Sequence, residues 1–570
     1  MAIKKSSSNK LAATLQLLII LAILVAVNIL GNYFFQRIDL TEDKRFSLSK
    51  PTKNLIKDLE DIVYIKVYLE GDFPADIKRL RDATKEILME FKAYGGENFE
   101  YEFIDPTNFD DPNQKKQFLE ALIEKGLIVV PVRSYDGDEY TEKTTVPGLI
   151  VNYKGREFPI IITEAQKAMS NEERVNSSIS MLEYKMSNAI QKLKEDGFKT
   201  VAFSVDHGEL ENAELQSLAD ELSRFYFVKR VDLKKQIVLD PKEVEVLVIA
   251  RPTQPFERPE KFVIDQYIMN GGKVMWFIDP LAAALDSIGG GKEFVTSNYN
   301  LNLEDQLFKY GARINDDLVQ DAQCGYIPIL VGYIEDEPQT TMDKWYFNPI
   351  LNPQGNSPIT KNLGLVYGQF VSSLDTVNQN PKVKKTVLLT TSKYSRYLRN
   401  PVQVSLDATK LNLTEEQLNK PYLPAAVLLE GEFTSVFKNR LFESMRTFLD
   451  SMNISVKEEG VETKMLVVSD GDLIRNEVRG DGSILPLGTD QFSGKRFSNK
   501  EFFVNALEYL VDNTGLMETR NKEFTLRLLD RGKVKEEKRK WQFINFVMPL
   551  LIVLWFGVMY NFIRKRKYAR

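Results

Sequence analysis

Residues 200–209 read TVAFSVDHGE, a run of apolar and β-branched residues that ends abruptly in a polar turn. The apolar part predicts a buried β-strand. A second run, VLVI at 246–249, is apolar without interruption, which is typical of a parallel strand covered on both faces. Helical patterns at 215–225 and 259–270 separate these strands from their neighbours in the chain. The alternation predicts an α/β unit over residues 199–330.

A smaller α/β unit is predicted upstream. Strand-forming stretches alternate with helical patterns from about residue 55 to 165, and one of the strands is expected at 127–132. This β-α-β-α-β-β order suits a thioredoxin-like layer, to which we assign residues 36–170. The chain lacks the Cys-x-x-Cys pair that would make such a layer redox-active. An amphipathic connector helix is predicted within residues 171–198.

Residues 331–515 show little regular periodicity, and their first part is rich in Pro, Asn and Gln. Only the apolar runs at 425–429 and 464–468 and the helical pattern at 500–511 stand out. We therefore expect an irregular insertion together with the remaining α/β strands. A membrane-proximal segment is expected to follow at 516–542.

Two uncharged stretches lie near the ends of the chain, at residues 11–35 and 543–563. Each reaches the about 20 helical residues that a hydrocarbon core of ~30 Å requires. The first is about twice as long as the apolar core of a signal peptide, and no A-x-A-like cleavage site follows it. The second is flanked by Trp541 and by the basic residues 564–567. We predict two transmembrane helices rather than a cleaved signal and a buried core helix.

Short basic tails close the chain at both ends. Residues 1–10 carry three lysines, residues 564–570 carry five Lys or Arg, and neither tail has an acid. The positive-inside rule places both tails in the cytoplasm and the whole middle across the membrane. A basic cluster within 533–540 opposes this orientation, but it contains two glutamates and ends a long domain, where the rule is weak. Since the complete chain has a formal net charge of −5, the middle is strongly acidic and offers no footprint for nucleic acid.

The composition excludes several kinds of chemistry. Of the 570 residues, 43% are hydrophobic and 27% charged, as in a folded multidomain protein. The one cysteine, Cys324, forms neither an internal disulfide nor a cysteine-based zinc site. The one histidine, His207, rules out a multi-histidine metal site. Glycine clusters such as 289–291 are not followed by Lys-Ser or Lys-Thr, so they make no phosphate loop. We expect no metal, no cofactor and no catalytic residue.

The turn Asp206-His207-Gly208-Glu209 is the candidate ligand-binding site. It follows a buried strand, and ligands of open α/β sheets bind beyond the carboxyl ends of the strands. A histidine between two acids could act there as a base or contact a ligand. The alternative is a structural turn, in which Gly208 supplies an unusual backbone angle and the acids cap the next helix. The residues favour the structural turn and leave the binding role open.

Two other motifs fail the spacing that their chemistry needs. Cys324 lacks the small-x-Cys-x-Gly elbow of an amidotransferase-type nucleophile, so we do not expect it to be catalytic. Asp470-Gly471-Asp472 suggests a calcium loop, but the sixth and twelfth positions are Arg475 and Asp481 instead of Gly and Glu. We interpret that motif as a turn.

Four segments carry a resemblance to a known family. They are RIDLTEDKRFSLS at 37–49, DHGE at 206–209, VLLEGEFTSVFKNR at 427–440 and NFVMP at 545–549. Through them the whole chain resembles the GldG family, the gliding-motility-associated auxiliary components of ABC transporters in the Bacteroidetes.

The resemblance implies an inner-membrane protein with a large periplasmic region, beside a separate permease and a separate ATPase. It further implies a role in gliding motility and a link to type IX secretion. The unit at 199–330 would be like class I glutamine amidotransferases without their catalytic residues, a domain shared with an intraflagellar transport protein. Asp206 departs from the family pattern, which has Gly before His-Gly-Glu. Family architecture also implies two copies of the chain per complex, and periplasmic motility or secretion proteins as further partners.

Three functions compete at this point. The leading one is a non-catalytic coupling subunit, and Asn28, deep in the first predicted span, is its candidate contact with the permease. Polar side chains inside a bilayer usually face a protein partner. The second is a tethered periplasmic solute-binding protein with its ligand near His207. The third is an amidotransferase-like hydrolase, which would need Cys324 or His207 to be essential.

Overall fold

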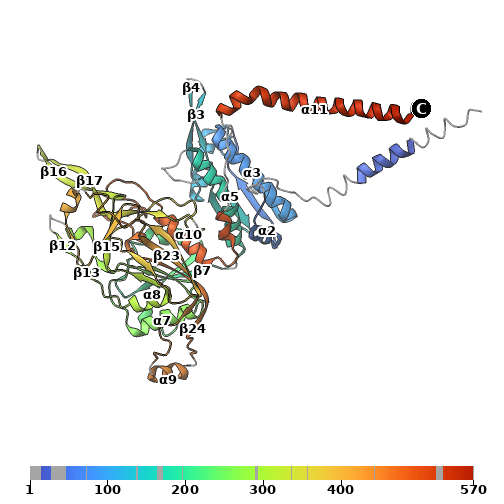
Figure 1. Ribbon diagram of the computed structural model, residues 1–570. Coiled ribbons are helices and arrows are strands. Elements are labelled where there is room, and N and C mark those ends of the chain that lie inside the picture. Colours follow the sequence, from blue (N-terminus) through green and yellow to red (C-terminus); the bar gives the residue numbers. More distant parts are fainter. Residues whose placement is uncertain are drawn as a thin grey trace, which may run out of the picture. The chain divides into compact units, whose positions relative to one another are not determined.

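The computed structural model describes residues 14–26, 47–71, 73–136, 139–163, 171–195, 197–288, 293–335, 337–355, 357–411, 413–441, 443–452, 454–521 and 531–568. The chain divides into two compact units, Met1–Lys522 and Glu523–Arg570. The first unit holds a small N-terminal α/β layer and a large mixed sheet covered by helices (Figure 1).

The N-terminal layer is built on a four-stranded sheet. Its elements are α2 (Lys50–Lys57), β1 (Val63–Val67), α3 (Ala75–Gly95), β2 (Phe99–Phe103), α4 (Pro112–Glu124), β5 (Gly148–Tyr153), β6 (Arg156–Ile161) and α5 (Asn171–Lys194). The strand order is β2-β1-β5-β6, in which β1 and β2 are parallel and β5 is antiparallel to both β1 and β6. Apolar side chains of the sheet, such as Val63 and Ile65, pack with Leu88 and Phe91 of α3 and Leu182 of α5. Hydrophobic burial therefore holds the connector helix against this layer.

The strand expected at 127–132 does not join this sheet. The structure instead has β3 (Val130–Asp136), which pairs with β4 (Glu139–Thr145) in a separate two-stranded hairpin. Residues 130–145 are rich in polar and charged side chains, so the sequence offers no apolar face that would pair this segment with the four-stranded sheet. Leu127, just before the hairpin, is buried in a small cluster with Leu122 of α4.

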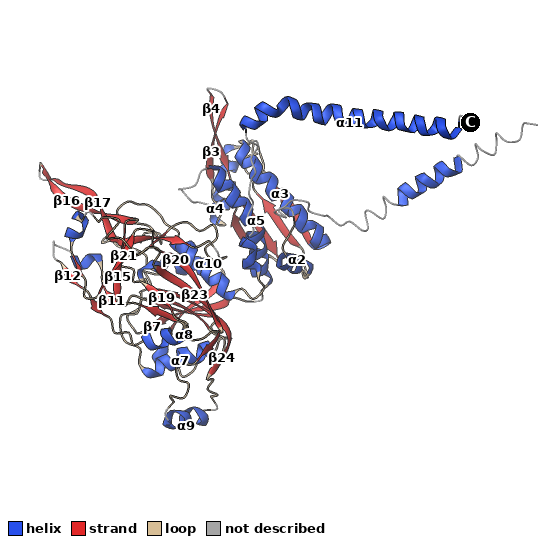
Figure 2. Cartoon of the chain, viewed as in Figure 1, coloured by secondary structure: helices blue, strands red, loops and turns tan. Residues whose placement is uncertain are grey.

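A ten-stranded sheet forms the centre of the rest of the first unit (Figure 2). Its main strands are β7 (Lys199–Val205), β8 (Tyr226–Asp232), β9 (Val246–Ala250), β10 (Lys273–Phe277), β16 (Cys324–Ile334), β17 (Glu337–Pro353), β20 (Val383–Thr390), β23 (Pro424–Thr434) and β24 (Glu459–Val468). They follow the order β16-β17-β20-β23-β24-β10-β9-β7-β8, and β18 (Val366–Tyr367) pairs with β17. The five strands from β24 to β8 are parallel, whereas those from β16 to β23 are antiparallel.

Successive residues of the parallel strands enter two different cores. The covering helices are α6 (Gln216–Leu222), α7 (Arg258–Met269), α8 (Glu304–Tyr310) and α10 (Asn499–Val511). Val246 and Val248 of β9 pack with residues of α6 and α10. Leu247 and Ile249 pack with residues of α7 and α8. The uninterrupted apolar run at 246–249 is thus explained by a strand covered on both faces.

Residues 331–515 supply β17, β20, β23, β24 and α10, and they also form short local pairings. The short elements of the unit are β11 (Leu281–Ala282), β12 (Phe294–Val295), β13 (Ser297–Asn298), β14 (Ala312–Ile314), β15 (Asp317–Asp321), β19 (Leu374–Thr376), β21 (Ser395–Arg399), β22 (Gln403–Val404), α9 (Glu443–Ser451) and the 3₁₀-helix η6 (Leu516–Asn521). Several of them pair as two-stranded ribbons.

The second unit contains the helix α11 (Arg531–Tyr568). Its stretch Lys533–Arg566 is long and apolar enough to cross a membrane. Near the other end of the chain, the described part of the predicted first span is a shorter apolar helix, Thr14–Ala26. Asn28 lies outside the described residues. The described chain therefore has one helix of membrane-spanning length and a shorter apolar one, and the arrangement with two spans stays a prediction.

Candidate functional site

The order of the five parallel strands defines a place where ligands usually bind. Numbered along the chain from β7 to β24, the strands lie in the order 2-1-3-4-5. The direction of the connections therefore reverses between β7 and β9. A crevice beyond the carboxyl ends of such a pair is the usual binding site in open α/β folds. The turn Asp206–Glu209 follows β7 at this position.

The crevice is filled by the chain itself. After β9, the backbone N–H groups of Thr253 and Gln254 donate to the carbonyl oxygen of His207 at 2.8 and 2.9 Å. The ring of Phe256 stacks on the imidazole of His207, with 3.9 Å between centroids and 8° between planes. His207 is completely buried. The only histidine is thus a packed part of the core, which its position at the end of a strand did not reveal.

Backbone geometry explains the residue types in the turn. Asp206 and Gly208 have φ angles of 77° and 73°, a left-handed conformation that glycine adopts without strain. A Cβ atom at Gly208 would lie 2.1 Å from the Thr253 hydroxyl oxygen. The Glu209 carboxylate accepts a 2.7 Å hydrogen bond from the His207 N–H. Burial acts to raise the pKa of Glu209, but the interactions with the side chain and backbone of His207 outweigh it and lower that pKa.

A polar hollow of about 420 Å³ lies outside this turn. It is lined by Val205, Asp206, Gly208, Glu209, Lys234 and Gln254. The Lys234 ammonium donates to the Asp206 carbonyl oxygen at 2.6 Å. Three of the four predicted site residues therefore line one hollow, whereas the His207 side chain does not reach it. Ligand binding by Asp206, His207, Gly208 and Glu209 stays a prediction.

A buried cluster of charges occupies the carboxyl ends of the neighbouring strands. Arg251 follows β9, Asp279 follows β10, and Asp472 follows β24. The Arg251 Nε lies 3.1 Å from Asp279 Oδ2 and 3.0 Å from Asp472 Oδ1, and Arg475 Nε lies 2.9 Å from the same Asp472 oxygen. Asp470 is buried nearby. The cluster links three parallel strands at the edge that also carries the candidate turn.

Gly471 permits this cluster to form. Its N–H donates to Asp279 Oδ1 at 2.7 Å. A Cβ atom at this position would lie 2.5 Å from Arg251 Cγ and 2.8 Å from Asp279 Oδ2. The motif Asp470-Gly471-Asp472, interpreted from the sequence as a turn, thus also holds a buried ionic network. Its one sequence signal is an acid pair directly after a buried strand.

Stability is expected to fall as the pH rises from about 4 to about 6 through this cluster. Burial raises the pKa of Asp279 to about 6, and the negative charge of Asp472 adds to the effect against the attraction of Arg251. The pKa of Asp470 is also raised, chiefly by burial. In this pH range the folded chain holds more protons than the unfolded chain, so deprotonation favours unfolding by on the order of 3 kcal/mol for Asp279. Chemical denaturation across this pH range should show a flatter dependence for Asp279→Asn than for the unaltered chain, and an unchanged slope would contradict the assignment.

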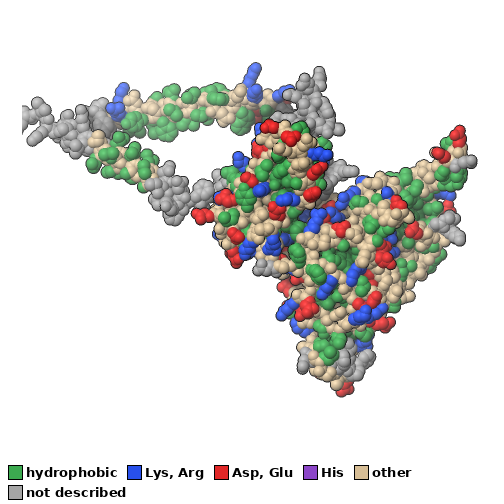
Figure 3. All heavy atoms as spheres, turned by 180° about the vertical axis from the view of Figure 1, so that it is seen from behind, with side chains coloured by type: hydrophobic (Ala, Val, Ile, Leu, Met, Phe, Trp, Pro, Cys, Tyr) green, Lys and Arg blue, Asp and Glu red, His purple; other side chains and the backbone are tan. Residues whose placement is uncertain are grey.

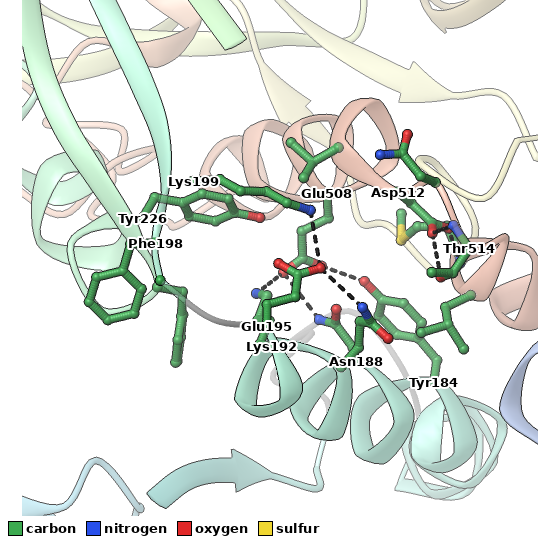
Figure 4. A pocket seen from close by; sticks show the side chains of 17 residues that line it. Tyr184, Asn188, Lys192, Glu195, Phe198, Lys199, Tyr226, Glu508, Asp512 and Thr514 are labelled. Carbon is green, nitrogen blue, oxygen red and sulfur yellow. Dashed lines mark hydrogen bonds and ion pairs between the residues drawn. The ribbon is translucent and has the colours of Figure 1, made fainter. Parts of the chain in front are cut away.

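A second pocket, of about 250 Å³, lies between the connector helix α5 and helix α10 (Figure 4). At its centre the Glu508 carboxylate accepts hydrogen bonds from the Tyr184 hydroxyl, the Asn188 amide and the Lys192 ammonium. The Lys192 ammonium also lies 4.7 Å from the centre of the Phe225 ring. Burial acts to raise the pKa of Glu508, but Lys192 outweighs it and holds that pKa below its usual value. This cluster ties the connector helix to the large sheet by charge and not only by packing.

The described residues offer no thiolate nucleophile and no evident metal cage. Cys324 lies at the start of β16, and burial raises the pKa of its thiol to about 12, so the reactive thiolate is scarce at neutral pH. Among the residues that the structure describes, no group of three or more His, Cys, Asp or Glu side chains is placed to hold a metal ion.

Comparisons with known proteins match both parts of the first unit. A family model described as "ABC-type uncharacterized transport system" matches residues 198–506, and one described as a domain of unknown function matches residues 42–152. An uncharacterized protein of Borreliella burgdorferi is 22% identical over 574 residues, which cover 99% of this chain and 99% of that protein. This relative therefore has the same extent.

Two solved structures show only a distant likeness. The N-terminal domain of mmIFT52 is 14% identical with a TM-score of 0.31, covering 55% of this chain and 98% of that one. A ThuA-like protein from Parabacteroides merdae is 9% identical with a TM-score of 0.26, covering 59% and 94%. Scores this low do not establish a shared fold.

Proposed function

We propose that this chain, which belongs to the family described as an ABC-type uncharacterized transport system, is a non-catalytic, membrane-anchored subunit that couples a separate permease and ATPase to an ectodomain. The family itself places the chain in an ABC transport system. The observation that carries the proposal is that the family match covers the α/β unit of a chain that also has a helix of membrane-spanning length.

Two features of the described residues support coupling over chemistry. The switch-point crevice, where relatives of such folds usually bind ligands, is occupied by Thr253 and Phe256 of the same chain. The Lys192–Glu508 cluster links the connector helix to α10, which packs on the large sheet. A crevice without room for a ligand, together with a charged link between α5 and α10, suits a subunit that transmits conformational change between the membrane components and the ectodomain.

The finer assignment rests on the sequence segments that resemble the GldG family. In this proposal the chain serves gliding motility beside the type IX secretion machinery, in the bacterial inner membrane. Both termini lie in the cytoplasm, two spans frame a large periplasmic region, and two copies take part in each complex. Periplasmic motility or secretion proteins are further candidate partners.

Purification of the tagged full chain in a gentle detergent tests the proposal. We expect a permease and an ATPase to accompany it in equal amounts, as measured by mass spectrometry and by the size of the complex. A chain that purifies alone from cells expressing its neighbouring genes would contradict it.

The substitution Asn28→Leu is expected to weaken the association with the permease about fivefold. An interhelical hydrogen bond inside a bilayer contributes about 1 kcal/mol, and leucine removes it without adding charge. The matched control is Asn561→Leu, which lies in α11 close to the basic end of the apolar stretch, where water can replace a protein partner. Equal recovery of permease with both variants would remove Asn28 from the proposed interface.

A tethered solute-binding protein is the second candidate, because a polar hollow of about 420 Å³ lies beside the turn at residues 206–209, outside the filled crevice. Binding to the folded state would raise the melting temperature, and above the dissociation constant this rise would follow the logarithm of the ligand concentration. A screen of periplasmic solutes against the full chain, with Gln254→Ala as the matched variant, distinguishes the two functions. A shift that Gln254→Ala abolishes would favour the receptor.

A further inference from the structure

A long hairpin of the large sheet presents apolar side chains to solvent. The part formed by residues 326–334 of β16 and 337–344 of β17, here called the arm, extends beyond the rest of the sheet (Figure 1). Near its end Val331, Tyr333 and Ile334 are 65%, 67% and 64% exposed. Exposed strands of this kind attract other chains unless something covers them. A covered state of the arm is therefore expected.

The tip of the arm is acidic, which restricts what can cover it. Glu335 and Glu337 flank the turn, and Asp336 stands between them in the sequence. Acidic side chains gather at this tip in the space-filling view (Figure 3). Among the described residues neither glutamate has an ion-pair partner. An apolar ribbon with an acidic end is repelled by an anionic lipid surface and fits an apolar recess with a cationic rim.

Elsewhere on the same unit the chain carries a hollow whose lining is mostly polar and includes both a few apolar side chains and several cations. This hollow, here called the recess, has a volume of about 710 Å³ and lies between α8, β14 and the segment after β23. Phe308, Ile314 and Val436 supply apolar side chains to its lining, and Lys309, Arg313, Lys438 and Arg440 supply cations. Its volume lies within the ~300–1,000 Å³ of pockets that enclose a drug-sized molecule, which is enough for two or three side chains of a hairpin tip.

The charges of the recess are only partly neutralised by their neighbours. Lys438 pairs with Glu459 of β24 at its edge. Of the lining acids, Asp305 pairs with Lys261 and Asp316 accepts a hydrogen bond from the Asn298 amide. Among the described residues this leaves Lys309, Arg313 and Arg440 without an ion pair, against the two acids Glu304 and Asp316. The rim therefore has an excess of positive charge.

We propose that the arm of one copy of this chain inserts into the recess of a second copy. Val331, Tyr333 and Ile334 enter the recess against Phe308 and Ile314, while Glu335 and Glu337 meet Arg313 and Arg440. Because every copy has both surfaces, a twofold pair makes the contact twice and closes on itself. The inference concerns self-association and does not depend on the proposed transporter role.

Cross-linking between two single-cysteine variants tests the contact directly. Both full-length variants are made in a Cys324→Ala background, one with Ile334→Cys and the other with Phe308→Cys, and they carry tags of different size. When the two are mixed in detergent with a short bis-maleimide, the cross-linked product of unequal tags should exceed either equal-tag product about tenfold. The matched control replaces Ile334→Cys with Tyr422→Cys, which is 58% exposed but outside the arm. No preference over that control would overturn the proposal.

Charge exchange provides an independent readout on the same full-length chain. Glu335→Arg with Glu337→Arg, and separately Arg313→Glu with Arg440→Glu, should each weaken self-association about tenfold in analytical ultracentrifugation. Combining all four substitutions should restore it, since the attraction is re-formed with opposite signs. Glu415→Arg with Glu416→Arg, two exposed acids elsewhere, should change nothing. A monomeric unaltered chain, an association that ignores the reversals, or arm-dependent binding to anionic lipid vesicles would each overturn the proposal.

Discussion

Replacing Asp472 by alanine is expected to lower the free energy of unfolding by about 3–5 kcal/mol. The substitution leaves Arg251 and Arg475, both mostly buried, facing each other without the carboxylate that lies 3.0 and 2.9 Å from them. A buried ionic network loses far more when one partner is removed than the network contributes as a whole. Chemical denaturation of the full chain in detergent, followed by tryptophan fluorescence, measures the loss.

The control for this prediction is the same substitution in a surface pair. Asp407 and Lys410 form an ion pair at 2.7 Å, but both side chains are more than three quarters exposed. Asp407→Ala should leave stability nearly unchanged, because water replaces the lost partner. Asp470→Asn is expected to be tolerated, since burial raises the pKa of that carboxyl well above its usual value and so favours the neutral form that asparagine resembles. If Asp472→Ala behaved like Asp407→Ala, the network would not be a structural element.

The parallel half of the sheet was predictable because its signal is local. The four consecutive apolar residues 246–249 predict a strand that is buried on both faces. In the structure, their side chains alternate between two hydrophobic cores. In the antiparallel half only β23 gave a comparable signal, the apolar run at 425–429. In the arm, residues 326–334 form an apolar run that contains Pro328 and Gly332, so no alternation of apolar and polar residues marks a strand. The first strand of the arm pairs with β17, and the hydrophobic pattern of one segment does not predict which other segment it pairs with.

In the candidate site, too, some features follow from the neighbouring sequence and others depend on residues far away in the chain. That Asp206 to Glu209 lie at the carboxyl edge of the sheet follows from the strand before them. The stacking of the His207 imidazole on Phe256 could not be predicted in this way, because Phe256 belongs to a segment that follows β8 and β9 in the chain. The charge cluster around Asp472 joins residues from three loops, so neither its acids nor its arginines identify it alone. Distant contacts decide burial, and burial decides what a polar residue can do.

Replacing Glu508 by alanine is expected to cost about 3–5 kcal/mol and to loosen the connector helix from the large sheet. The Lys192 and Glu508 side chains are only 15% and 10% exposed, so the loss leaves a largely buried ammonium without its partner, beside an unpaired Tyr184 hydroxyl. Since the pKa of Glu508 is lowered in the folded state, its contribution is present above pH ~4.5 and is lost as the pH falls further. The same denaturation experiment detects the change in stability, and limited proteolysis around residues 196–197 detects the loosening.

The double substitution Lys192→Ala with Glu508→Ala separates the charge effect from simple loss of packing. If the unpaired ammonium causes the damage, the double variant should be more stable than Glu508→Ala alone, because no buried charge then lacks a partner. Glu432→Ala, which breaks the exposed pair with Lys382, should leave both stability and proteolysis unchanged. A double variant as unstable as the sum of the single ones would mean that the side chains act only by filling space. In that case the link between connector and sheet would be hydrophobic, and a coupling role for the charged cluster would fail with it.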